Sequence, residues 1–294
     1  MAGQSLSRAL AQALSREEYV EQAYFFRTLR ERLADSTPIQ EVLVGIREEI
    51  LATTRLPMAI DFLTGELKLK GQLGQGMARL AHYFTPFQTY IVSRSEEESA
   101  RLDFSIALRI LERQAEFLTQ IPVNAAALFI FQFECLARNK LGYDTGIKAI
   151  AEDPAYPPEW SAWITRIRML LGTTDFADLV YSQSQQYLDD QRKHLNNPEL
   201  TSSAPVLFDG QAGRIARANL RKDPLYLFAA LQRQLGYPTV PRPRVATTSS
   251  QIPPQIDARL QRLEGRIALL EQEQRGGLDL SQFYKSPGEE GPVE

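Results

Sequence analysis

The sequence predicts an all-α protein: a predominantly helical globular body with one or two short strands at most, followed by a coiled-coil helix. Three observations favour this fold class. Apolar residues recur three and four positions apart through most of the first 237 residues, as on a helix with one buried face. Ser, Thr, Asn or Asp precedes these runs, and Gly or Pro often follows them. Hydrophobic residues make up 44% of the 294 residues, enough to build a substantial core.

The first two helices have recognisable starting signals. Ser15 and Glu18 have the spacing of a capping box, in which each side chain bonds the other residue's backbone N–H. Thr37 suits an N-cap and Pro38 the first helical position, where a missing N–H costs nothing. Because a residue before proline disfavours the helical region, we expect the second helix to end at Leu56.

The next segment changes pattern. Apolar and charged residues alternate over residues 65–71, which predicts a short exposed strand. A Thr-Pro start at residues 85–86 then opens a long helix reaching about residue 118. Residues 93–95 are the place where that helix would break, with Ser95 and Glu98 capping a new start.

The most apolar helix should begin after Asn124 and lie at the centre of the fold, because it is apolar nearly all round. Its apolar run, residues 125–137, is shorter than the ~20 residues that a membrane helix needs. Gly142 and Tyr143 suit the C′ and C″ positions of a Schellman cap. Further helices are expected after the Pro-rich turn at residues 153–158.

The rest of the body continues the helical pattern. One helix should end at Gly172, and the next should open at Thr174, continue through Tyr187 and end before Asn196. Residues 201–213 read as a loop with a short strand at 206–208. Asp223 and Pro224 start the last helix of the body.

Composition divides the chain into four parts. Residues 1–237 form the helical body, 238–254 a Pro-rich linker, 255–275 a short coiled coil, and 276–294 a flexible acidic tail. Within the body, units at about 80–144 and 170–237 resemble each other, most clearly in two Leu-Gly-Tyr triplets, at 141–143 and 235–237. A duplicated helical unit would explain the likeness. The alternative is that Leu-Gly-Tyr is simply the signature of a helix cap.

The coiled coil is the strongest local pattern. Five apolar residues follow one another at steps of 4, 3, 4 and 3, which places them at the a and d positions of a heptad repeat. Charged residues of opposite sign fall at g and e, where they would pair between parallel helices. The apolar residues are Ile256, Leu260, Leu263, Ile267 and Leu270; the charged ones are Arg259, Glu264, Arg266 and Glu271. The alternative is an amphipathic helix that docks on its own body.

The cysteine and histidine content and the net charge limit the kinds of site that the chain could form. Cys135 is the only cysteine, so an intrachain disulfide is excluded, and the two histidines, His82 and His194, lie far apart in sequence. We expect no catalytic, metal or cofactor site. A net charge of −3 gives no general attraction to nucleic acid or an anionic membrane. Without a visible secretory signal or membrane span, a cytoplasmic protein is the expectation.

Three groups of residues are candidate sites. Arg214, Arg217, Arg221 and Lys222 would share one helix face and contact phosphates, or form an ordinary solvated face. The glycines at 71, 74 and 76 precede a helix and would cradle a phosphate, or form a turn. Glu134, in the most apolar helix, would be an acid–base residue, the partner of Arg138 one turn later, or part of a less buried helix face.

The function that the sequence favours is that of a non-enzymatic interaction or scaffold protein. It would self-associate through its coiled coil as a homo-oligomer and bind an unidentified protein partner through its body. One alternative is an all-helical enzyme or small-molecule binder with a pocket near Glu134, Tyr143 and Trp163. Another is a nucleic-acid-binding regulator that uses the basic helix face.

Overall fold

The computed structural model describes residues 14–35, 37–97, 102–120, 122–202 and 204–242, and within these ranges it contains thirteen helices and no strand. The prediction of an all-α body is confirmed for this part of the chain. The described residues belong to the first of two compact units, Met1–Pro243, and the second unit, Arg244–Glu294, lies outside them. The helices are α2 (Arg16–Ala34), α3 (Ile39–Glu49), α4 (Leu56–Lys70), α5 (Leu73–Arg79), α6 (Pro86–Glu96), α7 (Phe104–Leu118), α8 (Ala125–Arg138), α9 (Tyr143–Ala151), α10 (Pro158–Leu170), α11 (Phe176–Ser182), α12 (Gln185–His194), α13 (Gly210–Ala218) and α14 (Pro224–Leu235).

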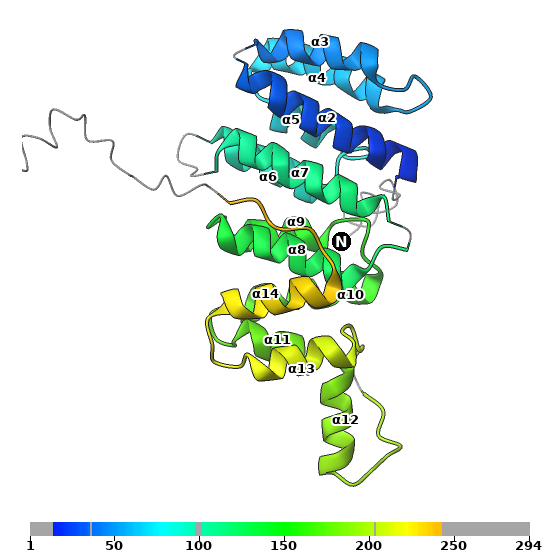
Figure 1. Ribbon diagram of the computed structural model, residues 1–294, viewed down its shortest axis with the longest axis vertical. Helices are drawn as coiled ribbons and strands as arrows, with labels where there is room; N and C mark the ends of the chain where they lie inside the picture. Colours follow the sequence, from blue (N-terminus) through cyan, green and yellow to red (C-terminus); the bar gives the residue numbers. More distant parts are fainter. Residues whose placement is uncertain (1–13, 36, 98–101, 121, 203, 243–294) are drawn as a thin grey trace, which may run out of the picture. The chain divides into compact units, whose positions relative to one another are not determined.

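The helices of the first unit pack in successive layers (Figure 1). The antiparallel pair α3 and α4 begins the series, and α2 and α5 form the next layer against it. Helix α2 also packs on α7, α5 packs on α6, and α6 reaches α9. Helices α8, α9 and α10 follow. Helix α14 returns to lie between α8 and the α11–α13 pair, and α12 contacts α13 and α11.

The core is continuous through these layers, and α8 lies at its centre. The side chains of α8 from Ala126 to Leu136 are all buried. The ring of Phe129 contacts Trp163 edge-on with centroids 5.0 Å apart, and its contacts extend to Trp160, Phe176 and Phe208. The prediction that this helix is central is therefore confirmed. Of the helices that the structure describes, none has both the length and the apolar character needed to cross a bilayer.

Capping explains several helix starts. Thr85 forms the complete box with Gln88: each side chain bonds the other residue's backbone N–H, at 3.3 and 3.0 Å. Asn124 caps α8 through the N–H of Ala127. The predicted box at Ser15 and Glu18 is wrong, because Ser15 makes no side-chain cap bond and Glu18 bonds residues distant in sequence.

The predicted strand at residues 65–71 is also wrong. Leu56 and Pro57 begin α4 rather than ending a helix, and α4 continues through Lys70 to Gly71, which has φ 72°. The two leucines of the alternating pattern do not share a buried face: Leu67 faces the core, whereas Leu69 on the same helix is 80% exposed. Glu66 turns its carboxylate towards Arg79 and Lys70 at the edge of this layer.

Three other helix boundaries differ from those predicted. The long helix after residue 86 is two helices, because α6 ends at Glu96 and Asp103 caps α7 through two backbone N–H groups. The single helix predicted between Thr174 and Asn196 is likewise divided into α11 and α12, with Ser184 capping α12. The Schellman cap of α8 lies two residues earlier than predicted: Lys140 has φ 52°, and the N–H of Leu141 bonds the carbonyl of Leu136 at 3.0 Å.

This last shift bears on the proposed duplication. Gly142 is the N-cap of α9, with φ −62°, whereas Gly236 ends α14 with φ 69°. The two Leu-Gly-Tyr triplets therefore differ in backbone conformation. In addition, α7 alone separates α6 from α8, whereas α12 and α13 separate α11 from α14. The duplication stays a prediction that these triplets do not support.

The strand expected at 206–208 is reduced to a single bridge between Phe208 and Ser184. The N–H groups of Leu207 and Phe208 both bond the carbonyl of Gln183, at 2.8 and 3.0 Å. These bonds hold the long loop after α12 against the turn between α11 and α12.

Candidate functional site

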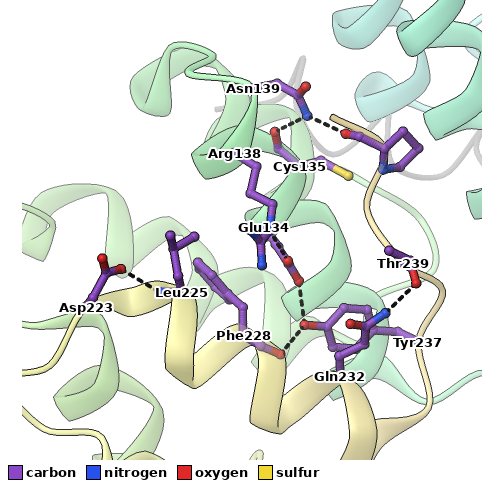
Figure 2. A network of polar contacts seen from close by, with 11 residues as sticks. Glu134, Cys135, Arg138, Asn139, Asp223, Leu225, Phe228, Gln232, Tyr237 and Thr239 are labelled. Atoms are coloured by element: carbon purple, nitrogen blue, oxygen red, sulfur yellow. Dashed lines mark hydrogen bonds and ion pairs between the residues drawn. The ribbon is translucent and has the colours of Figure 1, made fainter. Parts of the chain in front are cut away.

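A buried carboxylate on α8 organises a polar network at the centre of the body (Figure 2). The side chain of Glu134 is 3% exposed, and it forms an ion pair with Arg138, one helical turn later. Its second oxygen accepts a 2.6 Å hydrogen bond from the Tyr237 hydroxyl, which also lies 3.0 Å from the carbonyl oxygen of Phe228. Both carboxylate oxygens therefore have partners within the chain, as a buried charge requires.

The same network fixes the segment that follows α14. Residues 237–242 run along α8 in extended form, and we call this segment the strap (Figures 1 and 2). Tyr237 and Val240 are each 3% exposed. The Asn139 amide donates to the carbonyl oxygens of Cys135 at 3.0 Å and Pro241 at 3.2 Å. The first residues of the predicted Pro-rich linker are thus packed on the body.

The pKa shifts in this network favour a structural role, in which it holds the strap on α8, over a role in proton transfer. Burial, together with the charge of Glu134 and its hydrogen bond, raises the pKa of Tyr237 well above its ordinary value of 10.0. Burial and the same carboxylate raise the pKa of the Cys135 thiol. Both groups therefore stay protonated at neutral pH, and a buried thiol of this kind is unreactive. Of the interpretations of Glu134, the ion pair with Arg138 is the one that the geometry shows, and the side chain is too buried for the less buried face.

A second buried carboxylate, Asp153, has no cationic partner among the described residues. Gln132 donates to one of its oxygens and the N–H of Ala155 to the other, each at 3.0 Å, and Thr85 bonds it as well. The Tyr156 hydroxyl donates to Gln132 at 2.6 Å and so orients that amide towards the carboxylate. Burial raises the pKa of Asp153 above its ordinary value of 3.8.

Asp153 escaped the sequence analysis because it stands in a Pro-rich turn, where aspartate commonly caps or turns the chain. Its side chain does bond a backbone N–H two residues later, in the usual manner of such a turn. Only the tertiary structure shows that α6 and α8 enclose the carboxylate. The Asp-Pro sequence alone carries no signal of this burial.

A third polar group ties α2 to its neighbours. Glu18 accepts hydrogen bonds from the Tyr83 hydroxyl and the Arg55 backbone N–H, both at 2.8 Å. Buried Gln88 donates to Gln22 at 2.9 Å. Burial is the main cause of the raised pKa of Tyr83. The three networks join α2, α4, α6, α8 and the strap, and each contains at least one bond between side chains distant in sequence.

The predicted phosphate cradle is occupied by a side chain of the protein. The Glu96 carboxylate accepts the N–H groups of Leu73, at 2.5 Å, and Gly74, at 2.9 Å. A Cβ at Gly74 would lie 2.5 Å from the Ser93 hydroxyl oxygen, and one at Gly76 would lie 2.9 Å from Leu63. These two glycines allow α5 to pack closely on α6 and α4, so close packing accounts for them.

The predicted basic face is not a single helix face. Helix α13 ends at Ala218, and Arg221 lies in the following turn with φ 59°. Arg217 forms a 2.7 Å ion pair with Asp190, and Arg214 donates to Gln186 at 3.0 Å. Lys222 is exposed beyond the helix. The structure therefore places Arg214 and Arg217 together on α13 but separates Arg221 and Lys222 from them.

The residues of the predicted pocket have separate surroundings. Trp163 is buried in the aromatic core beside Phe129, and Glu134 is enclosed by Arg138 and Tyr237. Tyr143, 45% exposed, stacks on Phe133 with ring centroids 5.8 Å apart. Within the described ranges, no group of three or more His, Cys, Asp or Glu side chains could hold a metal ion.

All nine residues predicted to form the coiled coil, from Ile256 to Glu271, lie outside the described residues. No family model, no curated protein and no solved structure matches this chain. The functional argument therefore rests on the body and on the heptad pattern.

Proposed function

We propose that this chain is a non-enzymatic interaction protein that binds a protein partner through its helical body and self-associates through residues 256–271. The observation that supports the first part is the layered packing of the body together with apolar side chains left exposed on it. Met58 and Leu69, three turns apart on one face of α4, are 68% and 80% exposed, and Val44 on the neighbouring α3 is 53% exposed. Exposed apolar side chains that gather on one face commonly mark protein-binding surfaces.

The buried polar networks support the same proposal in another way. Glu134 and Arg217 are among the groups that the sequence offers for acid–base or phosphate chemistry, and Glu96 fills the predicted phosphate cradle. Each is engaged by a side chain or backbone group of the chain itself. Such engagement gives these residues roles in holding helices together, which suits a rigid binding body.

Self-association rests on the heptad pattern, in which apolar spacing and charge placement agree. The opposite charges at g and e favour parallel pairing. About two and a half heptads give a weak association by themselves, so the coil would act with contacts between bodies or through increased valency.

The binding half of the proposal is tested by affinity capture from the native host with the full-length chain as bait. The matched bait carries serine at Met58 and Leu69, both exposed and therefore replaceable without disturbing the core. A protein retained by the wild-type chain and lost with this variant supports the proposal. Equal capture by both baits, or capture of nucleic acid alone, contradicts it.

A further inference from the structure

The outer face of α4 carries a stripe of four residues with the spacing of a coiled-coil seam. They are Met58, Phe62, Gly65 and Leu69, and the steps between them are 4, 3 and 4. Met58 and Leu69 are 68% and 80% exposed, Gly65 is exposed and Phe62 is half-buried. Helix α4 packs on α2, α3 and α5 through other residues. The stripe therefore lies away from the core of the body.

The support under this stripe is fixed. Arg47 on α3 forms a 2.9 Å ion pair with Asp61 and so ties α3 to α4. Val44 on α3 is 53% exposed and widens the apolar area. Layered helical proteins normally end in a polar face, because a bare apolar end is poorly soluble. An apolar stripe at heptad spacing on a fixed helix is instead typical of a surface that pairs with another helix.

The stripe is complementary to itself in shape. When α4 of a second copy runs antiparallel to it, a two-fold axis passes between residues 63 and 64. Met58 of each copy then lies opposite Leu69 of the other, and Phe62 lies opposite Gly65. No atom lies within 4 Å of the position that a Cβ on Gly65 would take. The place opposite each phenylalanine ring is therefore open.

The charges beside the stripe are complementary in the same arrangement. Asp61 and Lys68 lie seven residues apart and so on the same side of the stripe, at g positions of the heptad. Across the two-fold axis, Lys68 of one copy is level with residue 59 of the other, about 3 Å along the helix from Asp61. Arg47 contacts both Asp61 and Glu48, so this group keeps one negative charge. Two ion pairs between Asp61 and Lys68 can thus form, one at each end of the contact.

The size of the contact sets the conditions under which it forms. Two helices that pair along three turns bury less than the roughly 1,200 Å² of a small stable interface. The α4 contact alone should therefore not hold two chains together at micromolar concentration. Residues 256–271 would raise the local concentration of the bodies enough for it to form. A parallel pair of coiled-coil helices has two-fold symmetry, which is the symmetry that the α4 contact needs.

We propose that α4 pairs antiparallel with α4 of a second copy of this chain, with Phe62 over Gly65 and Asp61 facing Lys68. The pairing forms in chains that are already joined through residues 256–271. The inference rests on the proposed function: it names a second copy as the protein that binds the α4 face, and it identifies the contact between bodies that a short coiled coil requires.

Charge reversal tests the pairing in the full-length chain. Asp61→Lys places cations opposite each other at both ends of the contact, and Lys68→Asp does the same with carboxylates. Each variant alone should dimerise about tenfold more weakly than the wild type, measured by light scattering over a range of concentrations at low salt. An equimolar mixture of the two should regain the wild-type affinity, because opposite charges meet again at both ends. Glu199→Lys, exposed in the loop after α12, changes the net charge as Asp61→Lys does and should leave dimerisation unchanged.

Unchanged circular dichroism shows that each variant keeps the folded body, and recovery in the mixture also excludes misfolding as the cause of the loss. Dimerisation of both single variants with wild-type affinity, or a mixture no tighter than its components, overturns the proposal.

Other outcomes separate this proposal from the proposed function. If the charge reversals have no effect but the bait with serine at Met58 and Leu69 loses a different host protein, the face belongs to that protein. That result overturns the α4 pairing and leaves the proposed function standing. A wild-type chain that stays single at every concentration overturns the α4 pairing together with self-association through residues 256–271.

Discussion

Replacing Tyr237 with phenylalanine isolates the contribution of the strap's anchor to stability. The change removes one hydroxyl and keeps the ring, which packs against Phe131 with centroids 6.4 Å apart. The lost group donates to the buried Glu134 carboxylate at 2.6 Å. A hydrogen bond to a charged acceptor contributes roughly 1.5–3 kcal/mol, because the acceptor is left partly unsatisfied when the donor is removed.

We therefore expect Tyr237→Phe to lower the free energy of unfolding by about 2 kcal/mol. For a body of this size, that loss lowers Tm by roughly 4–8 °C. The measurement is urea unfolding followed by circular dichroism, with thermal unfolding as a second probe. Tyr226→Phe is the matched control: Tyr226 is 67% exposed, so its substitution should change stability by no more than about 0.5 kcal/mol.

A double-mutant cycle with Glu134→Gln tests whether the two side chains act as a pair. If they do, the double variant loses less stability than the two single variants together. Additive losses, or a Tyr237→Phe effect as small as that of Tyr226→Phe, would refute the idea that this hydrogen bond fixes the strap.

Two further substitutions test the account of the interior, and a third, at exposed Gly65, is the control for one of them. The pKa of Asp153 is raised in the fold, so the native state holds its proton more tightly than the unfolded chain, and stability should fall as pH rises from about 3.8 through the folded pKa. Asparagine does not ionise, so the urea midpoint of Asp153→Asn should fall less over this pH range than that of the wild type. The same pH dependence of the midpoint in both proteins would contradict this assignment. Gly74→Ala should destabilise by about 1–3 kcal/mol, since its Cβ would lie 2.5 Å from the Ser93 hydroxyl oxygen. Gly65→Ala, with open space around it, should stabilise by about 0.5 kcal/mol in the same unfolding assay, and equal effects at the two glycines would show that close packing does not explain Gly74.

Local signals predicted much of the fold. Thr85 and Asn124 cap the helices that their positions suggested, and the apolar character of α8 predicted its central place. These features depend on residues within a turn of one another, and short-range patterns record them well. The Schellman cap of α8 shows the limit of such patterns, because Lys140 adopts the left-handed conformation while the nearby glycine does not need it.

Contacts between distant residues account for what the sequence analysis missed. The alternation at residues 65–71 resembled a strand because nothing in the sequence reveals that Leu69 faces away from the core. Glu96 reaches the N–H of Gly74 from 22 residues away, and Glu134 meets Tyr237 across 103 residues. Such pairings depend on how the helical layers assemble, which spacing along one helix does not encode.

The measurement that tests the proposed function most directly is the mass of the protein in solution, determined by light scattering over a range of concentrations. The full-length chain of 33.2 kDa should show a mass of at least two chains. Deleting residues 255–275 should return it to a single chain while the circular dichroism of the body persists. Replacing Leu263 and Ile267 with aspartate should have the same effect, because both occupy the predicted apolar seam. A single-chain mass for the full-length protein, or an oligomer that survives both changes, would contradict self-association through this segment.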